Sequence, residues 1–366
     1  MDEINLETFI LHLKRKVVAG SFHVSQKTAQ VLRHYISISK WPNAKVIIDQ
    51  IKSIGKRLID AQPLEFCIGN IVRRVLFIIR EEYITLKRNL PNLIRLDSSK
   101  NNLLTYEDPD TIDYSSHIPT LKSQVIEAIG ELIEEMKGLH KNVAEHAIEH
   151  IHSNEIIMTF GCSRTVEQFL VEAARKRKFG VIVVESAPSL EGRKTALTLS
   201  KNPNIDVTLI PDSAIFALMS RVNKVIIGTH AVMANGGLIA PSGTHSLVVA
   251  AKYHSVPIVV CTGLYKLCPL YAYDQDTFND FGSPGEYLKF QEAEYLVNVH
   301  SYNPSFDYIP PELVSLFITN NGGHNPSYIY RLLQEYYDPR DMLEDDDEDV
   351  NNNNNNNNNN SEISQK

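Results

Sequence analysis

One stretch decides the fold of this chain: Ile156-Ile-Met-Thr-Phe-Gly-Cys-Ser-Arg-Thr-Val-Glu167. A short apolar run breaks here into small and polar residues, as a buried parallel strand does when its carboxyl end reaches a site. A second stretch has the same form: Ile226-Ile-Gly-Thr-His-Ala-Val-Met-Ala-Asn-Gly-Gly237. We therefore expect two buried strands whose loops carry the candidate functional residues.

Further apolar runs surround these two, and helical patterns lie between most of them. The runs cover residues 156–159, 181–184, 205–210, 224–228, 256–261 and 295–299. Such alternation is typical of a doubly wound, mostly parallel sheet. The sequence therefore predicts a Rossmann-like α/β domain over residues 153–338, with ligands expected outside the carboxyl ends of its strands.

The chain before this domain reads as helices. Ile47, Ile51, Ile54 and Leu58 follow helical spacing, and Asn43 precedes them as an N-cap. We expect an N-terminal helical domain over residues 1–118, with a mobile loop near 96–118 that is rich in Asp, Ser and Asn. A long linking helix is predicted over residues 119–152.

Charge is concentrated near the C-terminal end. The run Glu344-Asp-Asp-Asp-Glu-Asp349 contributes −6 of the formal net charge of −8, and asparagines occupy 351–360. We expect residues 339–366 to form a disordered tail, most simply a solvated one, with a functional acidic tail as the alternative. The remainder is close to neutral, which does not favour nucleic acid as a partner.

Composition and cysteine usage indicate a soluble cytosolic protein. Apolar residues make up 43% and charged residues 22% of the chain, and no apolar run is long enough to span a bilayer. The N-terminus has no pattern of a secretory signal. The cysteines, at 67, 162, 261 and 268, lack the spacing of a disulfide framework or a zinc site.

The first strand-end loop offers candidates for ligand binding. Ser163 is placed to cap the following helix, and Arg164 with the free N–H groups would suit a phosphate. Cys162 is a candidate nucleophile near that helix N-terminus, although a small apolar filler is the commoner role of a lone cysteine. Glu185 ends the next strand, and Gly161 begins the loop.

The second loop offers His230 as a base for Cys162, but the sequence shows no carboxylate or amide that would orient the imidazole. Asn235, Gly236 and Gly237 suit either a tight turn or close approach of a ligand. His146-Ala-Ile-Glu-His150 matches an inverted zinc-protease motif, yet no third ligand is evident. We expect no metal and no cofactor.

Several runs resemble the alpha/beta/delta regulatory-subunit family of translation initiation factor 2B. They are Met158–Leu170, Glu172–Phe179, Val184–Pro188, Ser220–Gly228 and Pro310–Leu313, with Gln62-Pro63 ahead of Gly69–Leu76 in the helical half. The similarity extends to about Asp338. The ending Asn325–Tyr337 resembles the beta branch of that family rather than the alpha or delta branch.

The family shares its fold with methylthioribose-1-phosphate and ribose-1,5-bisphosphate isomerases, which use a catalytic Cys in the first loop and a catalytic Asp in the second. By that pattern the Cys position falls on Gly161 and the Asp position on His230. Cys162 lies one residue late, so its side chain points elsewhere. The resemblance therefore implies a degenerate pocket and a protein that is not an isomerase.

The resemblance further implies a non-catalytic regulatory subunit of a guanine-nucleotide exchange factor. Its implied partners are the alpha and delta regulatory subunits, the gamma and epsilon catalytic subunits, and the alpha subunit of initiation factor 2, whose phosphorylation the complex senses. The alternative is a ribose-1-phosphate type isomerase that uses Cys162 and His230 in an altered site.

Overall fold

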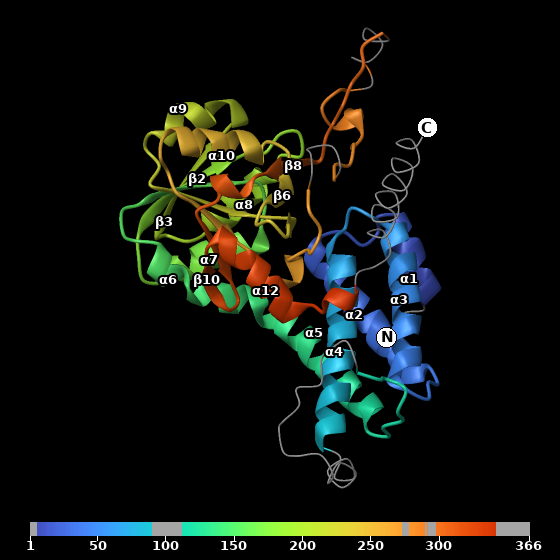
Figure 1. Ribbon diagram of the computed structural model, residues 1–366. Helices are drawn as coiled ribbons and strands as arrows, with labels where there is room; N and C mark the ends of the chain where they lie inside the picture. Colours follow the sequence, from blue (N-terminus) through green and yellow to red (C-terminus); the bar gives the residue numbers. More distant parts are fainter. Residues whose placement is uncertain (1–5, 90–111, 273–277, 290, 292–297, 342–366) are drawn as a thin grey trace, which may run out of the picture. The chain divides into compact units, whose positions relative to one another are not determined.

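The computed structural model describes residues 6–89, 112–272, 278–289, 291 and 298–341 (Figure 1). The chain divides into two compact units. The helical unit combines residues 1–134 with residues 334–366, and the Rossmann-like unit comprises residues 135–333. The sequence predicted boundaries at 118, 152 and 338, at the ends of expected elements. The contacts within the chain divide it instead inside α5, between 134 and 135, and inside α12, between 333 and 334.

The helical unit is built from antiparallel helices whose apolar faces meet. Asn43 caps its third helix as predicted, because its Oδ1 accepts a hydrogen bond from the backbone N–H of Val46 at 3.1 Å. Ile47, Ile51 and Leu58 of that helix are fully buried. The helices are α1 (Leu6–Lys14), α2 (Ser21–Ile38), α3 (Ala44–Ala61), α4 (Cys67–Asn89) and the first part of α5 (Leu121–Glu145).

The predicted mobile loop lies partly outside the described residues. Its residues 96–111 are not described, whereas 112–118 pack on the helical unit as an irregular segment. Tyr114 and Ile118 of this segment are buried. The carbonyl of Tyr114 accepts a hydrogen bond from Lys45 N–H, in the first turn of α3, at 3.1 Å. The described part is therefore tied down by backbone hydrogen bonding.

The long helix predicted over 119–152 is interrupted. It ends as α5 at Glu145, and a short helix α6 (Ala147–His150) follows. At the junction His146 N–H bonds to Val143 O, a tighter turn than the regular helical pattern.

The Rossmann-like unit contains a seven-stranded sheet in the order β10-β9-β7-β4-β1-β2-β3. Neighbours pair in parallel except at the β9–β10 edge, which is antiparallel. This confirms the predicted doubly wound, mostly parallel fold. The strands are β1 (Ile156–Phe160), β2 (Phe179–Val184), β3 (Ile205–Ile210), β4 (Lys224–Gly228), β7 (Ile258–Cys261), β9 (Leu316–Thr319) and β10 (Gly322–His324).

Helices and a small second sheet complete this unit. The helices are α7 (Arg164–Ala174), α8 (Gly192–Leu199), α9 (Ile215–Met219), α10 (Thr244–Tyr253) and α12 (Ile329–Tyr336), whose last turn passes into the helical unit. The antiparallel sheet has the order β5-β6-β8, from Ala231–Val232, Leu238–Pro241 and Phe306–Ile309.

One predicted strand is wrong. Residues 298–299 of the run 295–299 form no strand, and 295–297 lie outside the described residues. The large sheet instead gains β9, which pairs in parallel with β7. Hydrophobicity alone could not show whether 295–299 or 316–319 forms the strand, because pairing with β7 depends on which segment the folded chain places beside it.

The end of the chain differs from the predicted tail. Residues 339–341, assigned from the sequence to a disordered segment, form a 3-10 turn, and Asp341 is fully buried. The acidic and asparagine runs beyond them lie outside the described residues.

Candidate functional site

The carboxyl ends of β1 and β4 lie side by side where the strand order reverses. β1 pairs with β2 on one side and with β4 on the other. Open α/β sheets bind ligands at such a reversal. The loops also touch, because a Cβ added to Gly228 would collide with the Ser163 side chain. The two loops singled out from the sequence therefore meet at one edge of the sheet.

The first loop does not activate Cys162. Its Sγ is exposed and lies 3.8 Å from Glu167 Oε1. Desolvation of the thiol raises the pKa of Cys162; a hydrogen bond with Thr195 lowers it, and the carboxylates of Glu167 and Glu191 raise it again. A helix N-terminus was expected to lower this pKa, but the local carboxylates and desolvation outweigh it. The thiol is therefore protonated at neutral pH, which is unfavourable for a nucleophile.

Gly161 turns the chain between β1 and this thiol. Its φ of +64° lies in the left-handed region that glycine adopts without strain. Its carbonyl lies 3.0 Å from Thr195 Oγ1, a buried hydroxyl of α8 that is also 3.0 Å from Glu167 Oε1. Thr195 thus holds the loop against two helices. Nothing in the sequence around Thr195 marks this role.

Ser163 occupies the N-cap position of α7, but its side chain makes no capping hydrogen bond. Packing against Gly228 turns the hydroxyl toward β4 instead. Arg164 follows as an exposed residue at the start of α7. The predicted capping role of Ser163 is therefore wrong, whereas its place at the helix start agrees with the sequence.

A buried histidine beside this loop was missed from the sequence. His140 Nδ1 lies 3.0 Å from Thr165 Oγ1. Desolvation lowers the pKa of His140 to about 4, with further lowering from the charges of Arg164 and Lys266. The imidazole is therefore neutral at physiological pH.

Glu185 follows β2, where a ribose-binding acid would stand. It forms an ion pair with Arg193 of α8, at 2.9 Å from Oε2 to Nη2. The structure thus gives this carboxylate a partner within its own α/β unit. Ion pairing does not exclude ligand binding, but it accounts for the residue without one.

The candidate residues of the second loop contact one another and residues of β8. His230 stacks on Phe306, with ring centroids 4.5 Å apart. Asn235 Nδ2 donates to Tyr308 Oη at 2.8 Å, and Asn235 Oδ1 accepts from Gly237 N–H at 2.9 Å. These contacts build a tight turn in which Gly236 has φ +82°.

The candidate nucleophile and the candidate base each contact another residue in the described part of the chain. Cys162 Sγ is hydrogen-bonded to Glu167 Oε1 at 3.8 Å, and the His230 ring is stacked on Phe306. His146 and His150 also fail to gather a metal set, since no group of three or more His, Cys, Asp or Glu residues that could hold a metal occurs among the described residues. No described helix is both long and apolar enough to cross a membrane.

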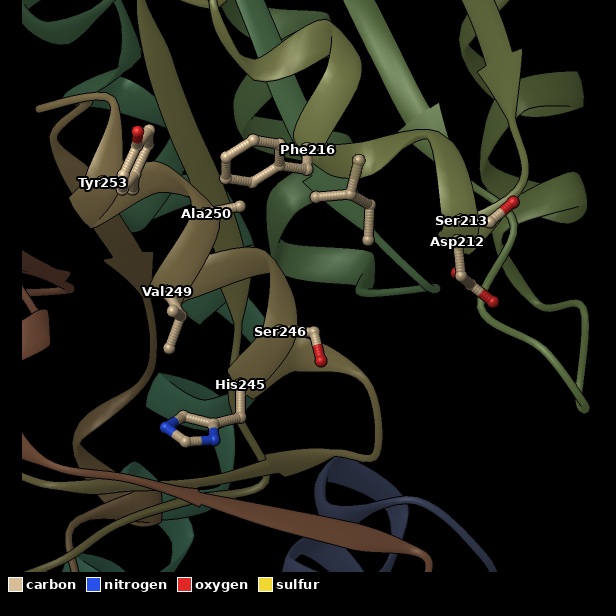
Figure 2. Close-up of a pocket in the computed structure, with 9 residues that line it drawn as sticks. Asp212, Ser213, Phe216, His245, Ser246, Val249, Ala250 and Tyr253 are labelled. Atoms are coloured by element: carbon tan, nitrogen blue, oxygen red, sulfur yellow. The ribbon is translucent and has the colours of Figure 1, made fainter.

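A groove between α9 and α10 is the second notable feature of this unit. Its volume is about 420 Å³. Figure 2 shows Phe216 of α9 opposite Val249 and Tyr253 of α10, and the Phe216 and Tyr253 rings lie 5.2 Å apart. These three side chains are 53%, 48% and 74% exposed. The lining is completed by Asp212, Ser213, Ile215, His245, Ser246 and Ala250.

Asp212, which lines the groove, also binds the turn that follows β2. Asp212 accepts hydrogen bonds from the backbone N–H groups of Ser186, at 3.1 Å, and Ala187, at 2.6 Å. The carboxylate thereby holds the turn that follows β2 and Glu185.

The helical unit carries an acidic face on α4 and α5. Partial burial raises the pKa of Glu82, and the charges of Glu81, Glu131 and Glu127 raise it further. Like charges held this close repel one another. We call Glu82, Glu127 and Glu131 the acidic face; its chemistry suits a cationic partner.

The fold defines a class: a helical unit joined to a Rossmann-like unit with a mostly parallel sheet, whose strand-end loops meet where the strand order reverses. The model of the initiation factor 2 subunit family matches residues 17–326. The chain belongs to that family.

Relatives of the chain agree with this membership. It is 66% identical over 375 residues to translation initiation factor eIF2B subunit beta of Dictyostelium discoideum, covering 93% of this chain and 96% of the relative. The crystal structure of eIF2B beta from Chaetomium thermophilum matches with TM-score 0.72 and 30% identity, over 92% of this chain and 93% of that one.

A third relative is a complex. The crystal structure of the tetrameric eIF2B-beta2-delta2 complex from C. thermophilum contains a chain that matches with TM-score 0.68 and 28% identity, over 91% of this chain and 94% of that one. The predicted resemblance to initiation factor 2B subunits is thereby confirmed.

Proposed function

We propose that this chain is a non-catalytic, beta-type regulatory subunit of the complex that exchanges guanine nucleotide on initiation factor 2. The observation that carries the proposal is its 66% identity, across 93% of its length, to a relative named as the beta subunit. Its partners would be the alpha and delta regulatory subunits and the gamma and epsilon catalytic subunits. The subunit would help to sense phosphorylation of the alpha subunit of initiation factor 2.

The state of the strand-end site supports the absence of isomerase activity. Proton transfer needs an acid and a base within reach of one substrate. Cys162 has a raised pKa and bonds to Glu167, and His230 stacks on Phe306. Gly161, at the position of the catalytic Cys of the related isomerases, has no side chain that could act.

The competing function is a ribose-1-phosphate type isomerase with an altered site. It would require that the purified chain interconvert such a substrate and that Cys162→Ala abolish the turnover. Absence of turnover in the wild-type chain, measured by NMR of the substrate over hours, removes this alternative.

We propose that the α9–α10 groove contacts another subunit of the same complex. Exposed Phe216, Val249 and Tyr253 form an apolar cluster around a concave centre, which is typical of interface anchors. The relative in the beta–delta complex makes a delta-type chain the first partner to test.

A charge introduced into the groove tests this contact. Phe216→Asp should weaken assembly with the delta-type subunit by about tenfold or more, because it buries a carboxylate at an apolar contact. Tyr330→Asp is the matched control, since Tyr330 is 56% exposed on α12, outside the groove. Native mass spectrometry reports the assembly. Equal loss in both variants, or in neither, excludes the groove.

We further propose that the acidic face binds a basic segment of initiation factor 2. Changing Glu82, Glu127 and Glu131 to glutamine should weaken that binding and flatten its salt dependence. Glu145→Gln, an exposed change at the end of α5, is the control. Unchanged affinity in the triple variant overturns this part while leaving the subunit role intact.

The whole proposal is tested by isolating the tagged chain from its own cells at low salt. We expect it to arrive with other initiation-factor subunits and to fractionate with the cytosol, its proposed location. A chain that arrives alone, in repeated preparations, contradicts the subunit role.

A further inference from the structure

Two short segments of the Rossmann-like unit pair ahead of β8; we call residues 278–287 and 302–305 the aromatic hairpin. Gly282 N–H donates to Asn303 O at 2.7 Å, and Ser305 N–H donates to Asp280 O at 2.8 Å. Figure 1 draws the first of these segments in orange. Because cross-strand hydrogen bonds set the backbone, the side chains of the hairpin hold defined directions.

The hairpin presents aromatic rings to solvent. Phe281, Tyr287 and Tyr302 are 59%, 45% and 71% exposed. The Phe281 and Tyr302 rings lie 6.0 Å apart at an interplanar angle of 60°. Tyr287 Oη donates to Tyr302 O at 3.3 Å, which fixes the third ring. Ordered rings lose little entropy on binding, so such a cluster is typical of a contact surface.

A carboxylate is held within the same hairpin. Asn303 is buried, and its Nδ2 donates to Glu286 Oε2 at 3.1 Å and to Ser283 O at 3.0 Å. Tyr287, the neighbour of Glu286, is bonded through its hydroxyl to Tyr302 O, so two contacts hold the carboxylate within the aromatic hairpin. Among residues 278–289 and 298–305, Lys289 is the single lysine or arginine, against the two carboxylates of Asp280 and Glu286.

We propose that the aromatic hairpin binds an arginine-bearing segment of another protein. The guanidinium would lie over the Tyr302 ring and pair with the Glu286 carboxylate. Exposed ring faces attract cations, and a planar guanidinium stacks on a ring while it bonds to a carboxylate. An ammonium group lacks this planar fit, so arginine is favoured over lysine. The surface is separate from the groove and from the acidic face.

Short fluorescent peptides of alternating arginine and glycine, and of alternating lysine and glycine, test the proposal by anisotropy with the full-length chain. We expect the arginine peptide to bind more tightly. Tyr302→Leu should weaken its binding about two- to fivefold, the typical effect of one exposed cation–π contact. Glu286→Gln should weaken it and reduce its dependence on salt.

Two controls separate this site from other acidic surfaces. Tyr330→Leu, at an exposed tyrosine of α12, should leave the affinity unchanged. A full-length variant in which the acidic residues of 344–349 become their amides should keep the Tyr302→Leu effect. The proposal is overturned if both peptides bind alike and Tyr302→Leu has no effect, or if the tail amides abolish binding. Thermal midpoints show that each variant is folded.

Discussion

Arg80 donates two hydrogen bonds to the carboxylate of Asp341, from Nε to Oδ2 at 2.9 Å and from Nη2 to Oδ1 at 2.6 Å. Asp341 is fully buried, and Lys52 Nζ lies 3.4 Å from its Oδ1. The C-terminal segment is thereby fastened to α3 and α4. Residues far apart in the sequence complete one unit, with the whole Rossmann-like unit inserted between them.

Asp341→Asn should destabilise the helical unit by about 3 kcal/mol, because it removes the carboxylate that is hydrogen-bonded to the buried Arg80 guanidinium and leaves only Asp338 Oδ2, 3.9 Å from Arg80 Nε. Denaturant unfolding followed by circular dichroism measures the loss. Glu7→Gln is the control: it breaks the exposed Arg57–Glu7 pair, and its effect should stay below about 1 kcal/mol. Equal effects would mean that the C-terminal contact is only superficial.

Gly192→Ala should destabilise the Rossmann-like unit by about 1–3 kcal/mol, since a Cβ there would collide with the carbonyl of Val184 at the end of β2. Gly138→Ala should instead stabilise the chain by about 0.5–1 kcal/mol, because the nearest atom to its Cβ is Asn142 Oδ1 at 4.0 Å in an open helix position. Thermal unfolding of both variants tests the contrast. Stabilisation by both changes would contradict the close approach of α8 to β2.

His140 should make stability depend on pH in acid. Its pKa is lowered from 6.5 to about 4 in the folded state, so the unfolded chain binds the proton more readily. The His140 contribution is therefore fully present above pH 6.5 and is lost as pH falls toward 4. The midpoint of thermal unfolding, measured across this range, should fall less steeply in His140→Gln than in the wild type. If the midpoints of the two proteins fall equally with pH, the His140 imidazole is solvated and the prediction is wrong.

The contribution of Glu82 to stability should depend on pH in the opposite direction. Its pKa is raised in the folded state, so the folded chain favours the protonated carboxyl. The stability associated with Glu82 is present at low pH and is lost as pH rises through the raised pKa. Glu82→Gln should therefore stabilise the chain slightly at neutral pH and have less effect in acid. A neutral or destabilising effect at pH 7 would show that Glu82 has a compensating partner.

Cys162 should react slowly for an exposed thiol. Its raised pKa keeps it protonated at neutral pH, so alkylation by iodoacetamide should accelerate steeply as pH rises. Glu167→Gln removes a carboxylate that raises this pKa, and it should speed labelling at neutral pH. Mass spectrometry counts the label, and the buried Cys67, Cys261 and Cys268 serve as internal controls. Fast labelling of wild-type Cys162 at neutral pH would contradict the raised pKa and support Cys162 as a nucleophile.

Sequence patterns were enough to predict those helices and strands that depend on residues close together in the chain. The Asn43 cap depends on a side chain and an N–H three residues away. The runs 205–210 and 224–228 became β3 and β4 with the predicted bounds. In the central strand β4 the apolar run is buried, as suits a strand covered on both faces, whereas β3 is an edge strand of mixed burial. The parallel fold follows from the order of such elements.

Contacts between distant residues were beyond these patterns. Ser163 was expected to cap α7, yet its hydroxyl turns toward the space left by Gly228, about sixty residues away in sequence. The pKa of Cys162 follows from desolvation and from carboxylates on two helices, and not from its place near a helix end. Side-chain direction and desolvation depend on neighbours that only the folded chain brings together.

By itself the sequence determined the family, the α/β class and the two strand-end loops, since these depend on residue types in consecutive order. Tertiary structure decided that the loops touch through Gly228, that Cys162 is hydrogen-bonded to Glu167 and that His230 is stacked on Phe306. It also decided that Asp341 belongs to the helical unit. A buried carboxylate is stable only beside its guanidinium, and that pairing exists only after the chain has returned to α4.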